Sequence, residues 1–152
     1  MKRGKPLRRT PLKRGDSQLK RTPLKKRSKK MQDKYVDRRA LVVDLLGQRP
    51  FCEACVIFSV KDGKTGVVGV NYSVDIHELI NRSQGGSILD LNNLLAVCRL
   101  CHTRITINPK EAELLGLHLE SWCKTDEHLD EAKRVRNDWK NGTATEPFWF
   151  ND

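Results

Sequence analysis

Four of the five cysteines form two pairs with identical spacing. Cys52 and Cys55 lie in the segment FCEAC, and Cys98 and Cys101 lie in VCRLC. Two cysteines three positions apart can bind one metal ion from a single tight turn, and a tetrahedral site needs four ligands. The two pairs therefore predict one structural zinc site held by four thiolates. Residues 56–97 separate the pairs, a spacer roughly twice as long as that of a compact zinc ribbon, so further structure must be built between them.

Two other interpretations of these cysteines remain open, namely buried free thiols and two disulfides. The chain starts with lysine and arginine and shows no hydrophobic signal region, which gives no support for an oxidising compartment. We therefore expect a cytoplasmic protein. Cys123 has no nearby partner and is expected to be a core or surface thiol. No apolar run approaches the ~20 residues of a membrane span.

The net charge of +10 is concentrated at the N-terminus. Residues 1–30, the basic arm, contain Asp16 as their single acidic residue, whereas the rest of the chain has more acidic than basic side chains. The basic arm has little apolar content beyond scattered leucines, so it cannot offset the entropy lost on folding. We expect it to be disordered when it is alone.

Within the basic arm, the pentapeptide Arg-Thr-Pro-Leu-Lys occurs twice, bounded by Arg9 and Lys13 and by Arg21 and Lys25. Proline stiffens each copy into an extended shape, and the flanking cations can follow a phosphate backbone or enter a minor groove. The arm therefore predicts a nucleic-acid partner. A solvated tail, a targeting segment and an acidic membrane surface are alternatives, although no amphipathic helix or lipidation motif supports the last.

Residues 31–152 have the composition of one folded domain. Apolar positions recur at mostly helical spacing in QDKYVDRRALVVDLLGQRP, ahead of the stop signals Gly47 and Pro50. This pattern predicts a helix that leads into the first cysteine pair. Residues 56–79 are rich in β-branched side chains around Asp-Gly-Lys, which predicts a hairpin and a further strand that ends near His77.

The second half of the domain is expected to be mainly helical. A helix should begin in residues 101–107, and Asn108, Pro109 and Gly116 provide an N-cap, a first-turn residue and a stop for a short helix. Apolar residues form one stripe over residues 126–140, which predicts the last helix. The aromatic tail is expected to pack on the core. The fold class is therefore α+β.

Polar side chains that could do chemistry gather between and beside the cysteine pairs: Asp75, His77, Glu78, Asn92, Asn93 and His102. In a regular strand, Asp75 and His77 face one way and Glu78 faces the other. His102 follows the second cysteine pair directly, so a metal knuckle can fix its position for use in a second site.

These residues carry a resemblance to a known family. The segment DIHELINRSQGGSILDLNNLLAVCRLCH is similar to the zinc-containing HNH endonucleases, in which a histidine-bearing strand, a Gly-Gly loop, an Asn-Leu pair and a C-x-x-C-H form a ββα-metal site. The likeness is to small HNH proteins often encoded by bacteriophages and bacteria, some with similar basic arms. It covers about residues 50–115. It implies a ββα-metal core with a four-cysteine zinc site, flanking helices and a location in the cytoplasm of a bacterium or phage-infected host.

The resemblance also assigns roles to single residues. It makes His102 a ligand of a catalytic divalent ion and Asn93 a residue that orients the histidine strand and loop by hydrogen bonding. His77 falls on the metal-binding position and Glu78 on the general-base position, where the family usually has a second histidine. The loop residue Arg82 is expected to contact nucleic acid together with the arm.

The departure at Glu78 leaves two assignments open. Histidine is suited to act as a base near neutral pH, whereas a carboxylate is a better ligand for a hard ion such as Mg²⁺. The roles can therefore be exchanged, with His77 activating water and Glu78 holding Mg²⁺ or another divalent ion beside His102. We favour the exchange. Asp75 then either orients His77 or assists the metal.

Three classes of function follow. The first is a metal-dependent endonuclease that nicks or cleaves DNA, with the arm making phosphate contacts of little sequence preference. The second is a zinc-stabilised DNA-binding or regulatory module that has lost its chemistry through Glu78. The third is a structural protein whose arm binds an acidic partner. Neither a small-molecule substrate nor an oligomeric state is indicated by the sequence.

Overall fold

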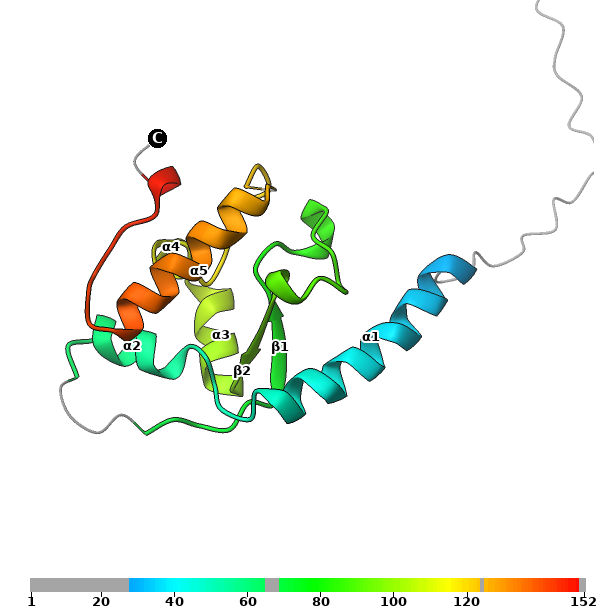
Figure 1. The fold of residues 1–152 in the computed structure, drawn as a ribbon, viewed down its shortest axis with the longest axis horizontal. Coiled ribbons are helices and arrows are strands. Elements are labelled where there is room, and N and C mark those ends of the chain that lie inside the picture. The colour runs from blue at the N-terminus through cyan, green and yellow to red at the C-terminus, as the bar shows by residue number, and fades with distance from the viewer. Residues whose placement is uncertain (1–27, 65–68, 124, 151–152) are drawn as a thin grey trace, which may run out of the picture.

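The chain folds into a mixed α+β structure with a small two-stranded antiparallel sheet (Figure 1). The computed structural model describes residues 28–64, 69–123 and 125–150. In chain order, the helices and strands of this part are α1 (Lys29–Gln48), α2 (Cys55–Lys61), β1 (Asp75–Glu78), β2 (Leu94–Val97), α3 (Arg99–Ile107), α4 (Pro109–Leu114) and α5 (Asp126–Lys140). Short 3₁₀ turns occupy Arg82–Gln84, Leu91–Asn93 and Phe148–Phe150.

Helix α1 confirms the helix predicted before the first cysteine pair. The Ser28 hydroxyl caps its start by accepting a hydrogen bond from the Met31 amide, and the helix ends just before Pro50. Leu45 is its one buried residue, and its N-terminal half extends away from the other elements (Figure 1). Because α1 begins at Lys29, it includes the last two residues of the expected arm. Arm residues Arg9, Lys13, Arg21 and Lys25 lie outside the described residues.

The hairpin predicted after the first cysteine pair is wrong in its first half. Residues Cys55–Lys61 form helix α2, which buries Ile57 and Phe58 and packs against α5. β-branched residues favour strands only weakly, and burial against a neighbouring helix overrides that preference. The Asp-Gly-Lys segment ends this helix, because Gly63 adopts the left-handed conformation with a φ of 67°.

The strand predicted at His77 is confirmed as β1. It pairs with β2 in antiparallel register, with Asp75 opposite Val97 and His77 opposite Leu95. The second cysteine pair follows β2 directly and opens α3, so β2, this cysteine pair and His102 form one continuous stretch of chain.

The three predicted C-terminal helices are confirmed as α3, α4 and α5. Gly116 follows α4 with a φ of 65°, and an added Cβ there would lie 2.6 Å from the Ala132 carbonyl oxygen of α5. The apolar stripe of α5 is buried, and Trp149 of the tail is only 3% exposed. The tail therefore packs on the core as expected. No helix in the described ranges is long and apolar enough to cross a membrane.

Candidate functional site

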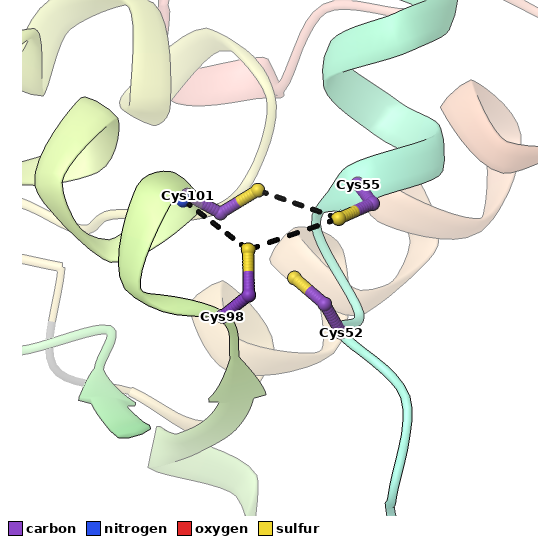
Figure 2. A group of neighbouring side chains, drawn as sticks. All are labelled: Cys52, Cys55, Cys98 and Cys101. Carbon is purple, nitrogen blue, oxygen red and sulfur yellow. Dashed lines mark hydrogen bonds between the residues drawn. The ribbon is translucent and has the colours of Figure 1, made fainter. Parts of the chain in front are cut away.

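The four paired cysteines converge at one buried point between the start of α2 and the start of α3 (Figure 2). All four sulfur atoms lie within 4.8 Å of one another, and the Cys55 Sγ is 3.9 Å from the Cys98 Sγ and 3.7 Å from the Cys101 Sγ. A disulfide needs sulfur atoms about 2.05 Å apart, and all four cysteines are free thiols, so the disulfide interpretation is excluded. Sulfur atoms bound tetrahedrally at about 2.3 Å from zinc stand about 3.8 Å apart, which matches the observed spacing.

Hydrogen-bond donors lie close to the sulfur atoms of the cluster. The Cys98 sulfur caps α3 by accepting a hydrogen bond from the Cys101 amide at 3.5 Å, and the Asn71 side-chain amide lies 3.9 and 3.8 Å from the sulfurs of Cys55 and Cys98. A hydrogen bond from the Cys101 thiol is the main cause that lowers the pKa of Cys52 to about 5. Burial raises the pKa of Cys55 to about 11, and the hydrogen bond to Cys52 raises the pKa of Cys101. The four cysteines could therefore hold a metal ion such as zinc.

Cys123 does not belong to this cluster. Its side chain is fully buried in the core, and burial raises the pKa of its thiol to about 11. Of the two alternatives left by the sequence, the structure supports a core thiol.

His77 is buried at 6% exposure on the face of β1 that looks toward α3. Its Nε2 lies 3.0 Å from the Leu117 carbonyl oxygen. A carbonyl oxygen can only accept, so the hydrogen of a neutral ring must be on Nε2, which leaves Nδ1 with a free lone pair. Burial is the main cause that lowers the pKa of His77 to about 4, and the charge of His102 acts in the same direction. The ring is therefore neutral at physiological pH.

His102 and Asp75 complete a cluster with His77. The imidazole rings of His77 and His102 lie 5.4 Å apart edge to face, and the His102 Nδ1 is 3.3 Å from one Asp75 carboxylate oxygen. The other Asp75 oxygen pairs with Arg99 at 3.0 Å. The separation is that of a hydrogen bond between imidazole and carboxylate, and it is also close to the ~3 Å between neighbouring ligands of an octahedral Mg²⁺. Asp75 and His102 are therefore the pair of this cluster that could hold a divalent ion.

Glu78 is not brought beside His102. Its carboxylate is buried on the opposite side of β1, where it lies 2.7 Å from Arg38 of α1 and 3.4 Å from Arg82. Alternation along the strand explains the separation, because Asp75 and His77 share one face and Glu78 occupies the other. The cluster beside His102 therefore contains Asp75 in place of the expected Glu78.

Asn93 ties the loop between the strands to the end of β1. Its side chain is 1% exposed and accepts a hydrogen bond from the Ile80 amide at 2.8 Å. Its amide group donates to the carbonyl oxygens of Ile80 and Ser87 at 3.1 and 2.9 Å. This is the arrangement that the resemblance implies for the middle asparagine. Asn92 is exposed and lies outside this network.

The second glycine of the Gly-Gly loop allows this close approach. A Cβ added at Gly86 would lie 1.9 Å from the Ile80 carbonyl oxygen and 3.1 Å from the Asn93 amide nitrogen. No other residue type fits there without moving the backbone. Gly86 and Asn93 together set the position of the strand end that carries His77.

Arg82, expected to contact nucleic acid, lies in the same loop. Its side chain is 46% exposed, pairs with Glu78, and contacts the Tyr35 ring of α1 at 5.4 Å from the ring centre. It therefore has both a structural role and an exposed part.

Comparison with known proteins adds no identification, since no family model, curated protein or solved structure matches the chain.

Several contributors to the site were not singled out from the sequence. Arg99 lies between the two cysteines of the second pair, three residues before His102. This position in the sequence could have marked it as a candidate site residue. Leu117 acts through its backbone carbonyl and Arg38 belongs to a distant helix, so only tertiary contacts identify them.

Proposed function

We propose that this protein is a metal-dependent endonuclease of the HNH type that hydrolyses phosphodiester bonds of DNA. The observation that carries the proposal is the gathering of Asp75, His77 and His102 on one side of the β1–β2–α3 unit, with Asn93 holding the intervening loop. A base, a pair of metal ligands and a rigid support are the parts that metal-assisted hydrolysis requires.

In this proposal, His77 is the general base. Its Nε2 is held by the Leu117 carbonyl, so the ring is fixed in one tautomer and Nδ1 can accept a proton from water. The lowered pKa keeps the ring neutral and ready to accept. An anionic phosphate bound near the ring raises this pKa, and a divalent cation held beside His102 lowers it, so the two charges act on the ring in opposite directions.

Asp75 and His102 are the residues that would hold the divalent ion. Carboxylate and imidazole on adjacent elements suit Mg²⁺ or Mn²⁺, with water and a substrate phosphate completing the coordination. When bound, such an ion polarises the phosphate and stabilises the leaving oxygen. Arg99, which pairs with Asp75 and is otherwise exposed, can also contact a phosphate.

In this proposal the four cysteines position other residues and take no part in the reaction. A closed cage of four thiolates leaves no open coordination position and suits structural zinc. Since Cys98 and Cys101 open α3, a zinc ion there fixes the helix start that carries His102. The two metals are therefore separate, one structural and one exchangeable.

The proposed partner is DNA. The basic arm contributes Arg9, Lys13, Arg21 and Lys25 as phosphate contacts, and Arg82 adds a partly exposed cation from the loop after β1, where it pairs with Glu78. Contacts of this kind bind without reading bases and weaken steeply as salt rises.

The test is relaxation of supercoiled plasmid by zinc-loaded protein in EDTA, Mg²⁺ or Mn²⁺. His77→Gln can keep a hydrogen bond to the Leu117 carbonyl but removes the base, and we expect nicking to fall by about 10²–10⁴-fold. His128→Gln is the matched control, because His128 lies among tail aromatics away from the cluster and should leave nicking unchanged. Glu78→Gln should retain most activity, since Glu78 faces the arginines. Activity lost with Glu78→Gln but kept with His77→Gln would refute the assignment.

A second candidate function is a DNA-binding module without catalysis. It is favoured by two observations: the four cysteines are the one group of three or more metal-ligating side chains found in the described ranges, and Glu78 is engaged by two arginines. Plasmid binding without cleavage, by folded and zinc-loaded protein in every metal tested, would support this second candidate.

A further inference from the structure

A polar cavity lies between α5 and the first residues of β2. It has a volume of about 140 Å³. Four cationic side chains, from the segment after α1 and from α5, line it, and two carboxylates accompany them: Arg49, Lys133, Arg136 and Lys140, with Glu53 and Asp130. We call it the basic cavity. None of the proposed catalytic residues Asp75, His77 and His102 lines the basic cavity, so the catalytic proposal does not use it.

Arg136 is the unusual member of the basic cavity. Its side chain is only 7% exposed, and one of its terminal nitrogens donates to the Gly116 carbonyl oxygen at 2.6 Å. The guanidinium has five N–H donors, and this is its single hydrogen bond among residues that the structure describes. None of the carboxylates there approaches it closely enough to form an ion pair. A buried cation without a counter-ion is costly in free energy.

One carboxylate that lines the same cavity, Glu53, is already engaged by other groups. Glu53 accepts a hydrogen bond from the Ala96 amide at 2.8 Å and pairs with Arg49 at 3.3 Å. Burial lowers the pKa of Arg136 to about 10, while the negative charge of Glu53 acts against this shift and the positive charge of Arg49 acts with it. Burial also lowers the pKa of Lys140. The cavity thus places the buried guanidinium of Arg136 beside three more exposed cations, an arrangement that a bound anion would stabilise.

We propose that the basic cavity binds a phosphate group. Arg136 and Arg49 offer planar forks that can each donate two hydrogen bonds to an oxyanion, and Lys133 and Lys140 offer point charges at the rim. A phosphate has enough oxygen atoms to engage all four cations, whereas a carboxylate has only two. The phosphate comes either from a free anion or from the backbone of a nucleic acid. The inference does not depend on hydrolysis and stands whether or not the catalytic proposal holds.

The test compares three zinc-loaded, full-length proteins: wild type, the double variant Lys133→Gln/Lys140→Gln, and Arg134→Gln. The double variant removes two rim charges that make no ion pair in the described part of the chain, so folding should be preserved. Arg134 lies on the same helix but points to Glu131 and Asp138, which makes it the matched control. Thermal unfolding is followed against inorganic phosphate at constant ionic strength, and affinity for a short DNA duplex is measured in parallel.

We expect phosphate to stabilise wild type and Arg134→Gln, with an apparent Kd raised at least about tenfold in the double variant, because a charge-assisted hydrogen bond contributes a factor of about ten or more. A response to inorganic phosphate supports a free anion as the source. A loss confined to DNA affinity supports a backbone phosphate, since the basic arm is the same in all three proteins. Equal responses to both ligands in all three proteins would overturn the proposal.

Discussion

Replacement of Asn93 by alanine tests how the catalytic strand is held. The Asn93 side chain is almost fully buried and makes three hydrogen bonds to backbone groups of Ile80 and Ser87. Each such bond contributes about 1 kcal/mol net, so Asn93→Ala should lower the free energy of unfolding by about 3 kcal/mol. The Ile80 amide, left buried without an acceptor, is the largest single part of this cost.

The measurement is urea unfolding, followed by tryptophan fluorescence and circular dichroism at a fixed concentration of free zinc. Zinc must be held constant because a metal that binds the folded state adds to its stability by mass action. Asn92→Ala is the matched control, since Asn92 is exposed and adjacent; its effect should stay within about 0.5 kcal/mol. A loss of less than about 1 kcal/mol for Asn93→Ala, or equal losses for both variants, would refute the reasoning.

Three further predictions concern the loop, the buried histidine and the cysteines. Gly86→Ala should lower the free energy of unfolding, because its Cβ would lie 1.9 Å from a backbone carbonyl oxygen. The control Gly47→Ala in α1 meets no atom within 4 Å and should raise the free energy of unfolding, measured with urea, by about 0.5–1 kcal/mol. The pKa of His77 is about 4 when folded and about 6.5 when unfolded, so the unfolded chain binds more protons between these values and stability falls as pH drops through this window. His77→Gln should lessen that fall, and a pH profile parallel to wild type would contradict this. Metal analysis should find no bound zinc in Cys98→Ser and one zinc per chain in Cys123→Ala. Zinc retained by Cys98→Ser would refute the four-cysteine zinc site.

The sequence by itself determined the parts of this protein that depend on spacing and periodicity. The two cysteine pairs predicted a four-ligand cluster, because identical short turns present thiolates in the same way. The apolar stripe of residues 126–140 predicted α5 and its buried face, because apolar residues with a 3.6-residue period lie on one side of a helix. The placement of His77 on a strand followed from the β-branched run before it and the loop signals after it.

Tertiary structure alone decided the features that depend on contacts between distant segments. Cys55–Lys61 became a helix because packing against α5 outweighed a weak strand preference. Glu78 was drawn to Arg38 from α1, while Asp75 took the place beside His102. The hydrogen of His77 was assigned by the Leu117 carbonyl, a backbone group that no side-chain pattern reveals. The basic cavity arose because residues of α5, of β2 and of the segment after α1 line one space, which sets the buried Arg136 near Arg49 from a distant part of the sequence. Burial of charge is a property of the folded arrangement.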